Sequence, residues 1–141
     1  MNDIKKFAQY AAMFEKVYLN DNWQLLKPFF HPDAVYEMVG EEQPLKGRDA
    51  IFAGLKKSLD LCDRRFKTRE LALLDGPKMK DDAVYILWRA TYHQPGLPTL
   101  CLEGEETLRF VDGCIVHMKD SCTPEVVSAF GQWMEEWGEQ L

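Results

Sequence analysis

The sequence predicts a single α+β domain, in which N-terminal helices are followed by a curved antiparallel sheet and a last helix. Apolar residues recur at helical spacing in the first part of the chain, and four stretches between residues 65 and 120 alternate apolar with polar residues. Short turns rich in Gly, Pro and Asp separate these stretches. A length of 141 residues with 46% hydrophobic residues fits one domain, residues 1–141, with one core.

Helices dominate the expected elements before the sheet. Asn2 or Asp3 can cap the first helix through its side-chain oxygen. Pro28 lies inside the second helix and removes a backbone donor, so we expect a kink or an early end there. The expected elements are a helix at Asp3–Leu19, a short helix at Trp23–Phe30, a strand at Ala34–Val39 and a helix at Arg48–Leu61.

Four strands and a final helix are expected in the rest of the chain. Because short turns join consecutive strands, we expect an antiparallel meander. Thr123, followed by Pro124 and Glu125, is typical of a capped helix start. The expected strands are Arg65–Leu74, Ala83–Tyr92, Thr99–Val111 and Cys114–Asp120, and residues 75–77 are expected to form the first turn.

Alternation assigns each strand residue to one face of the sheet, because side chains point to opposite faces in turn. The expected inner residues are Val84, Ile86, Trp88, Ala90, Tyr92, Leu100, Leu102, Gly104, Glu106, Leu108, Phe110, Val116, Met118 and Asp120. The expected outer residues include Arg89, Glu103, Glu105, Arg109, His117 and Lys119, beside Leu71 and Leu73, and the charged residues 64–69 are expected on a solvated strand face. Two acids, Glu106 and Asp120, therefore fall on the inner side.

Composition excludes several functions. A net charge of −6 argues against nucleic acid as a partner, since phosphate binding needs a basic surface. The sequence has no apolar run long enough to span a membrane and no signal peptide, so we expect a cytoplasmic protein. The four Cys and three His residues lack the spacing of zinc ligands, and we expect no metal site.

Three segments resemble the nuclear transport factor 2-like superfamily, which includes ketosteroid isomerase and the SnoaL-like polyketide cyclases. They are residues 30–37 (FHPDAVYE), 47–51 (GRDAI) and 108–116 (LRFVDGCIV). The resemblance extends over nearly the whole chain and implies a cone-shaped fold, in which the sheet wraps around the helices and leaves a cavity. These motifs are specific for the fold and weak for function, since this fold hosts many activities.

The resemblance also allows a comparison with ketosteroid isomerase, which uses an Asp base and an oxyanion hole made by a Tyr and a protonated Asp. The base position falls on Met38, the Tyr position on Phe14 and the protonated Asp position on Glu106. Since Met and Phe cannot replace the first two groups, we predict that the chain is not a ketosteroid isomerase. Asp120 resembles an acid near the cavity rim of the cyclases that works on the substrate.

Glu106 and Asp120 are accordingly the candidate catalytic residues. A carboxyl on an apolar inner face should have a raised pKa and could donate a hydrogen bond or a proton. Gly104, beside Glu106, is expected to leave room for a ligand. The structural alternatives are that Glu106 pairs with Tyr36 or another hydroxyl, or reaches solvent at the cavity mouth, and that Asp120 caps the final helix.

Two functions remain open. The first is an enzyme of the cyclase, isomerase or dehydratase type, which transfers protons on a small, fairly apolar carbonyl compound without a metal or organic cofactor. The second is a non-catalytic ligand-binding or interaction module of the same fold. We expect a small-molecule ligand, although in the second case the cavity either holds a ligand or is merely filled by side chains, and plain core packing is the alternative for the pocket residues. The candidate pocket residues are Phe14, Tyr36, Met38, Trp88, Tyr92 and Met118. The outer sheet face carries charges of both signs and is expected to form a homodimer.

Overall fold

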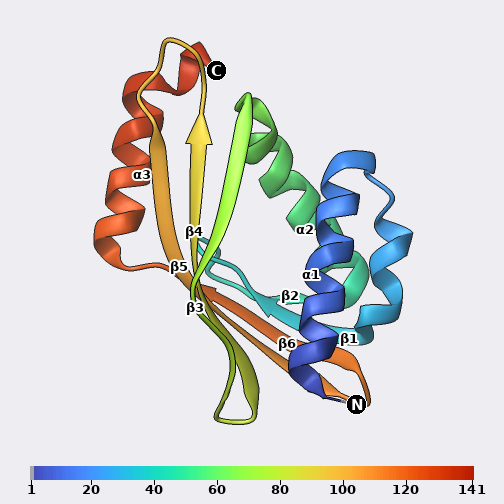
Figure 1. Cartoon of the computed structure of the whole chain (residues 1–141). Coiled ribbons are helices and arrows are strands. Elements are labelled where there is room, and N and C mark those ends of the chain that lie inside the picture. The colour runs from blue at the N-terminus through green and yellow to red at the C-terminus, as the bar shows by residue number, and fades with distance from the viewer. Residues whose placement is uncertain (1) are drawn as a thin grey trace.

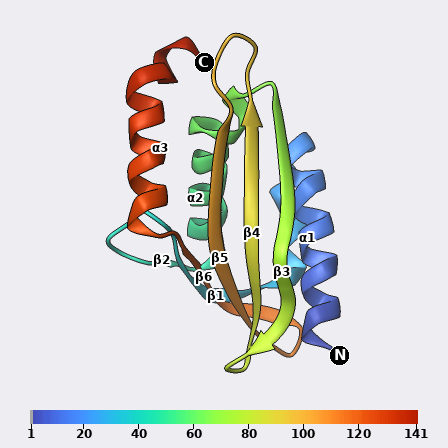
Figure 2. The same ribbon diagram turned by 60° about the vertical axis from the view of Figure 1, so that its left-hand side comes forward.

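A curved six-stranded sheet forms the centre of the molecule, with helices α1 and α2 over its concave side and helix α3 along one edge (Figures 1 and 2). The computed structural model describes residues 2–141. Its helices are α1 (Asp3–Asn20), α2 (Arg48–Leu61) and α3 (Pro124–Trp137), with 3-10 segments η1 (Trp23–Phe29), η2 (Asp63–Arg65) and η3 (Gly138–Gln140). Its strands are β1 (Phe30–Glu37), β2 (Leu45–Lys46), β3 (Thr68–Lys80), β4 (Ala83–His93), β5 (Leu100–Val111) and β6 (Cys114–Ser121).

The helices follow the local signals of the sequence closely. The Asn2 side chain caps α1 by accepting from the amides of Ile4 and Lys5, and Thr123 caps α3 in the same manner. The segment around Pro28 is a 3-10 helix that ends one residue later, in agreement with the missing backbone donor. None of the helices within residues 2–141 combines the length and hydrophobicity that crossing a bilayer requires.

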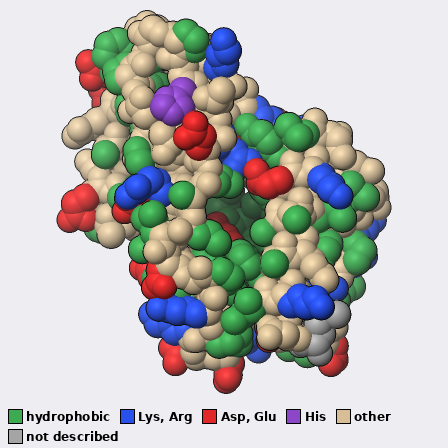
Figure 3. All heavy atoms as spheres, viewed as in Figure 1, with side chains coloured by type: hydrophobic (Ala, Val, Ile, Leu, Met, Phe, Trp, Pro, Cys, Tyr) green, Lys and Arg blue, Asp and Glu red, His purple; other side chains and the backbone are tan. Residues whose placement is uncertain are grey.

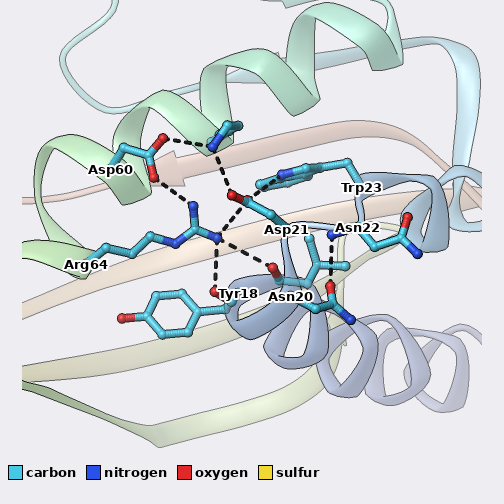
Figure 4. A network of polar contacts seen from close by, with 9 residues as sticks. Tyr18, Asn20, Asp21, Asn22, Trp23, Asp60 and Arg64 are labelled. Carbon is cyan, nitrogen blue, oxygen red and sulfur yellow. Dashed lines mark hydrogen bonds and ion pairs between the residues drawn. The ribbon is translucent and has the colours of Figure 1, made fainter.

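A polar network fixes the end of α1 to η2 (Figure 4). Asp21 ends α1 in the left-handed conformation, with φ of 59°. Arg64 donates to the carbonyl of Tyr18 at 2.9 Å and forms ion pairs with Asp21 at 2.9 Å and Asp60 at 2.7 Å. A cation at a helix C-terminus satisfies carbonyls that have no intrahelical partner and complements the helix dipole. This network therefore fixes η2, and with it Asp63, beside α1.

The sheet has the strand order β2-β1-β6-β5-β4-β3. The predicted meander from β3 to β6 is confirmed, since each of these pairs is antiparallel. Outside the meander, β1 pairs in parallel with β6 and antiparallel with the short β2, which was not expected. Residues 75–77 do not end β3 as predicted. The strand absorbs them as a register irregularity and continues to Lys80, which an edge strand tolerates.

The structure confirms which residues of β4 and β5 were predicted to lie on the inner and on the outer face of the sheet. Gly104 pairs with Trp88 and Glu106 with Ile86, while Arg89 forms an exposed ion pair with Glu103 at 2.8 Å. In β6 the prediction for Val116 is wrong. A register shift makes Ile115 the partner of Phe110, so Ile115 is fully buried and Val116 is only half-buried.

The faces predicted for β3 are also wrong. Leu71 pairs with Ala90 and Leu73 with Trp88, so both leucines share the inner face. The Arg69 side chain, expected on a solvated face, is only 5% exposed because its guanidinium stacks 4.0 Å from the centroid of the Tyr18 ring. An aromatic face attracts a guanidinium electrostatically and shields it from water.

Two apolar clusters hold the layers together. The larger one joins α1, α2 and the sheet, and its most deeply buried side chains include Leu26, Phe30, Ile51, Leu108 and Ile115. The smaller one lies near α3, where Trp133 packs on Phe66 and donates to the carbonyl of Pro98 at 3.2 Å. Because β6 pairs only with residues 105–111 of β5, α3 runs along the part of β5 that β6 leaves free.

Candidate functional site

A cavity of about 610 Å³ lies between the concave face of the sheet and helices α1 and α2. It is visible in Figure 3 as a hollow with hydrophobic walls and acidic atoms at its depth. The volume is in the range of small-molecule sites. The lining residues are Phe7, Tyr10, Ala11, Phe14, Glu15, Tyr36, Met38, Leu55, Ser58, Leu59, Asp63, Leu71, Ala72, Leu73, Ile86, Trp88, Ala90, Tyr92, Glu106, Met118 and Asp120.

Glu106 and Asp120 meet in this cavity. They are directly opposite each other in the antiparallel pair of β5 and β6, and their side chains hydrogen-bond to one another. The Tyr36 hydroxyl, from the neighbouring strand β1, donates to Oδ2 of Asp120. Oδ1 of Asp120 is buried and finds no other donor among residues 2–141. A proton shared by the two carboxyls lets one of them donate to the other, so the pair is satisfied when it holds one proton.

Burial decides where this proton lies. Desolvation raises the pKa of Glu106 well above its usual value, and the negative charge of Asp120 raises it further. Burial also raises the pKa of Asp120, but the hydrogen bonds from Glu106 and Tyr36 act in the opposite direction. Two carboxylates in contact cannot both ionise at low cost. Burial therefore favours one shared proton on the pair, and the hydrogen bonds to Asp120 favour its place on Glu106.

Tyr10 is a further polar group of the cavity that the sequence analysis missed. Its hydroxyl donates to the sulfur of Met118 at 3.8 Å, and burial, with a further contribution from the neighbouring acid pair, raises the pKa of Tyr10 well above its usual value. The comparison with ketosteroid isomerase pointed to Phe14 for a Tyr, whereas the hydroxyl comes from one helical turn earlier. Its spacing was a usable signal, since Tyr10 lies three residues after Phe7 and four before Phe14 on the apolar face.

All six predicted pocket residues line the cavity, together with the two predicted acids. Two structural alternatives for the acids are not what the structure shows: Tyr36 donates to Asp120, not to Glu106, and Thr123 caps α3 in place of Asp120. Glu106 is half-buried on the cavity wall, so the alternative that it reaches solvent at the cavity mouth stays a prediction. The expected space at Gly104 is absent, because the Trp88 indole fills it. A Cβ at Gly104 would lie 2.5 Å from Cζ2 of Trp88 and 2.9 Å from the carbonyl oxygen of Ser121.

A second polar group, which sequence reasoning also missed, borders the cavity away from the acid pair. Asp63 accepts a hydrogen bond from the Tyr92 hydroxyl at 3.1 Å, and its Oδ2 lies 3.6 Å from Nε of Arg69. Arg69 also binds Glu15 of α1 at 3.2 Å, which connects β3 to α1. Burial raises the pKa of Asp63, and the charge of Arg69 and the Tyr92 hydrogen bond oppose this shift. We call Glu15, Asp63, Arg69 and Tyr92 the distal cluster.

A smaller hollow on the outer sheet face lacks the features of this site. This hollow of about 330 Å³ is lined by Lys80, Lys119 and the hydrogen-bonded pair of Tyr85 and Glu105, without a buried acid pair. Within residues 2–141, no three His, Cys, Asp or Glu side chains group as metal ligands. The acid pair and its cavity are therefore the candidate site.

Comparison with solved structures supports the fold. The chain aligns with Bal32a from a soil-derived mobile gene cassette at a TM-score of 0.67 and 19% identity, covering 94% of this chain and 98% of that one. A candidate isomerase from Bacillus subtilis aligns at 0.66 and 20% identity, covering 93% and 96%. A candidate SnoaL-like polyketide cyclase from Jannaschia sp. CCS1 aligns at 0.66 and 14% identity, covering 91% and 92%. At these identities the likeness concerns the fold alone.

Comparison with protein families is more specific. A search of curated proteins finds no match to this chain. The profile of the SnoaL-like domain matches residues 10–118, which is most of the chain and includes Tyr10, Tyr36 and Glu106. The chain therefore belongs to the SnoaL-like domain family.

Proposed function

We propose that this protein is a cofactor-independent acid–base enzyme that transfers protons on a small, apolar carbonyl compound. The observation that carries the proposal is the half-buried Glu106–Asp120 pair, which faces the cavity and is satisfied by one proton. Such a pair offers an acid and a base side by side, as proton transfer at carbon requires.

The chemistry follows from the two roles. Asp120 takes a proton from the carbon next to the substrate carbonyl, and the electron pair of that C–H bond moves to form an enol. Glu106 gives its proton to the carbonyl oxygen, and Tyr10 and Tyr36 are hydrogen-bond donors in reach of the developing charge. Return of a proton to a different carbon completes an isomerisation. Attack of the enol carbon on a second carbonyl of the same molecule completes a cyclisation: the enol hydroxyl returns its proton to Glu106 as the first carbonyl re-forms, and the proton held by Asp120 goes to the second carbonyl oxygen, which becomes a hydroxyl.

The comparisons support this reading at a coarser level. Structural neighbours include proteins described as a candidate polyketide cyclase and a candidate isomerase. Cyclisation and isomerisation are both reactions of the proposed class. The rival hypothesis, a non-catalytic ligand-binding module, draws support from the apolar walls of the cavity and from Met38, which stands where the isomerase has its base.

Proton abstraction can be tested without the natural substrate. We expect the wild-type protein to accelerate deuterium exchange into 2-tetralone, a neutral bicyclic ketone, at the carbons next to the carbonyl, measured by mass spectrometry in D₂O. Asp120→Asn and Glu106→Gln should each slow the exchange by roughly 100-fold, the usual contribution of a positioned acid or base. Glu105→Gln, one residue away on the outer face, is the matched control and should exchange like the wild type.

The rival hypothesis makes the opposite prediction. If 2-tetralone binds saturably to the wild-type protein but exchanges no faster than with Asp120→Asn, the cavity only holds its ligand. The enzyme proposal would then be wrong.

A further inference from the structure

The charged side chains that line the cavity are all acidic. Four acids line it, namely Glu15, Asp63, Glu106 and Asp120, while no Lys, Arg or His among residues 2–141 does so. Arg69 contacts two of these acids from behind, with its side chain 5% exposed and its guanidinium stacked on Tyr18. Charges interact strongly where water is excluded, so this wall repels anions. A ligand carboxylate or phosphate would meet carboxylates at both polar ends of the cavity.

The two polar ends are far apart. Glu106 is opposite Ile86 on β4, and Tyr92 is six residues further along the same face of that strand. At roughly 3.4 Å per residue, the positions are about 20 Å apart along the strand. The wall between them is apolar and includes Leu71, Leu73, Trp88 and Ala90. The cavity is therefore long and apolar in the middle, with acceptors at each end.

The distal cluster has hydrogen-bonding capacity left over. Asp63 receives one hydroxyl, from Tyr92, although an ionised carboxylate has about four acceptor positions. Its side chain is 16% exposed, so little water competes for these positions. Nε of Arg69 is buried and has no hydrogen-bond acceptor among residues 2–141, since Asp63 lies 3.6 Å away. A ligand hydroxyl that donates to Asp63 and accepts from Nε of Arg69 would give each of these groups a further hydrogen bond.

We infer that the cavity selects a long, neutral, largely apolar ligand that donates a hydroxyl to Asp63, and that it rejects anionic compounds. Asp63 is on this view a specificity-determining residue. A buried acceptor discriminates strongly against a ligand that lacks the matching donor, because the acceptor is then left unpaired. The inference extends the proposed function by stating the substrate class, and it relies on that function only for the role of the acid pair at the other end.

Three matched probes test this by isothermal titration calorimetry. They are 4,4′-dihydroxystilbene, 4-hydroxystilbene and 4′-hydroxystilbene-4-carboxylate, which differ only in the group presented to the distal cluster. The wild-type protein should bind the dihydroxy compound roughly tenfold more tightly than the monohydroxy compound, as expected for a hydrogen bond to a charged group. It should bind the carboxylate at least roughly tenfold more weakly than the monohydroxy compound.

The variant Asp63→Asn removes the charge and keeps the shape. It should weaken binding of the dihydroxy probe, strengthen binding of the carboxylate and leave the monohydroxy probe unchanged. A merely structural role of Asp63 would move all three affinities in one direction. Glu70→Gln makes the same charge change on the outer face of β3 and should alter none of them.

The wild-type ranking already tests the inference if the variant does not fold. Equal or tighter binding of the carboxylate, or no saturable binding of the dihydroxy probe, would overturn it. Failure of the proposed function is a separate result: the probes would bind with the predicted ranking, while Asp120→Asn would not slow deuterium exchange.

Discussion

Replacing Glu106 by Gln should remove most of the pH dependence that the acid pair adds to stability. The pKa of Glu106 is raised well above the ordinary value of 4.5 by burial, while in the unfolded chain it returns to that value. Between these two values the folded protein holds a proton that the unfolded protein releases. Folding stability therefore falls as the pH rises above about 4.5 and becomes constant above the raised pKa.

The size of the effect follows from this linkage. One extra proton bound by the folded state lowers the free energy of unfolding by about 1.4 kcal/mol per pH unit. From pH 5 to pH 7 the wild-type protein can thus lose up to about 3 kcal/mol through this group. The amide introduced by Glu106→Gln does not titrate, and it can donate to Oδ1 of Asp120 in place of the carboxyl proton. The variant should therefore be more stable than the wild type at pH 7 and nearly equal to it at pH 4.5.

The assay is urea unfolding at half-unit steps from pH 4.5 to pH 8. Asp63, whose pKa is also raised by burial, contributes equally to both proteins and cancels in the difference. Glu105→Gln on the outer face makes the same change of charge and should follow the wild-type curve. Parallel stability curves for the wild type and Glu106→Gln would show that Glu106 is ionised in the folded protein, and the assignment of acid and base would fail.

Two further predictions concern the fold and the assembly. Arg64→Lys keeps the charge but loses the forked contacts with Asp21, Asp60 and the end of α1. We therefore expect the free energy of unfolding, measured in urea, to fall by about 1 kcal/mol. Unchanged stability would mean that the network in Figure 4 is dispensable. We also propose that the outer sheet face, with its exposed Arg89–Glu103 pair, joins two copies into a dimer that weakens with salt, and sedimentation of a monomer at micromolar concentration in low salt would contradict this.

The elements that the sequence predicts well are those with local causes. The bounds of α2 agree with the prediction at both ends, because its apolar spacing and its flanking residues lie within one segment. The acids Glu106 and Asp120 could be placed on the inner face by parity, since each lies among apolar residues of the same phase. The cavity could be expected only through the family resemblance, because alternation alone does not distinguish a hollow from a filled core.

The elements that escaped prediction depend on distant partners. Tyr36 and Asp120 are 84 residues apart and meet because β1 lies parallel to β6, a pairing that no turn signal indicates. In β3, leucines occupy both phases, so the charge of Arg69 led to the wrong inner face. That error hid the distal cluster, because Arg69 is buried by Tyr18 of α1 and paired with Glu15, and neither neighbour can be read from β3.

The way the acid pair is satisfied distinguishes a functional group from a structural one. A buried acid pair contributes little stability compared with apolar residues of similar volume, so a structural role would require that its partners be complete. Here Oδ1 of Asp120 has no hydrogen-bond donor among residues 2–141, and Tyr10 finds only a sulfur atom, at 3.8 Å. All three groups face the same cavity, where a substrate oxygen could accept from Tyr10 and Glu106. Because Tyr10, Glu106 and Asp120 line one cavity with hydrogen-bonding capacity left over, the arrangement supports the proposal that they act on a bound molecule.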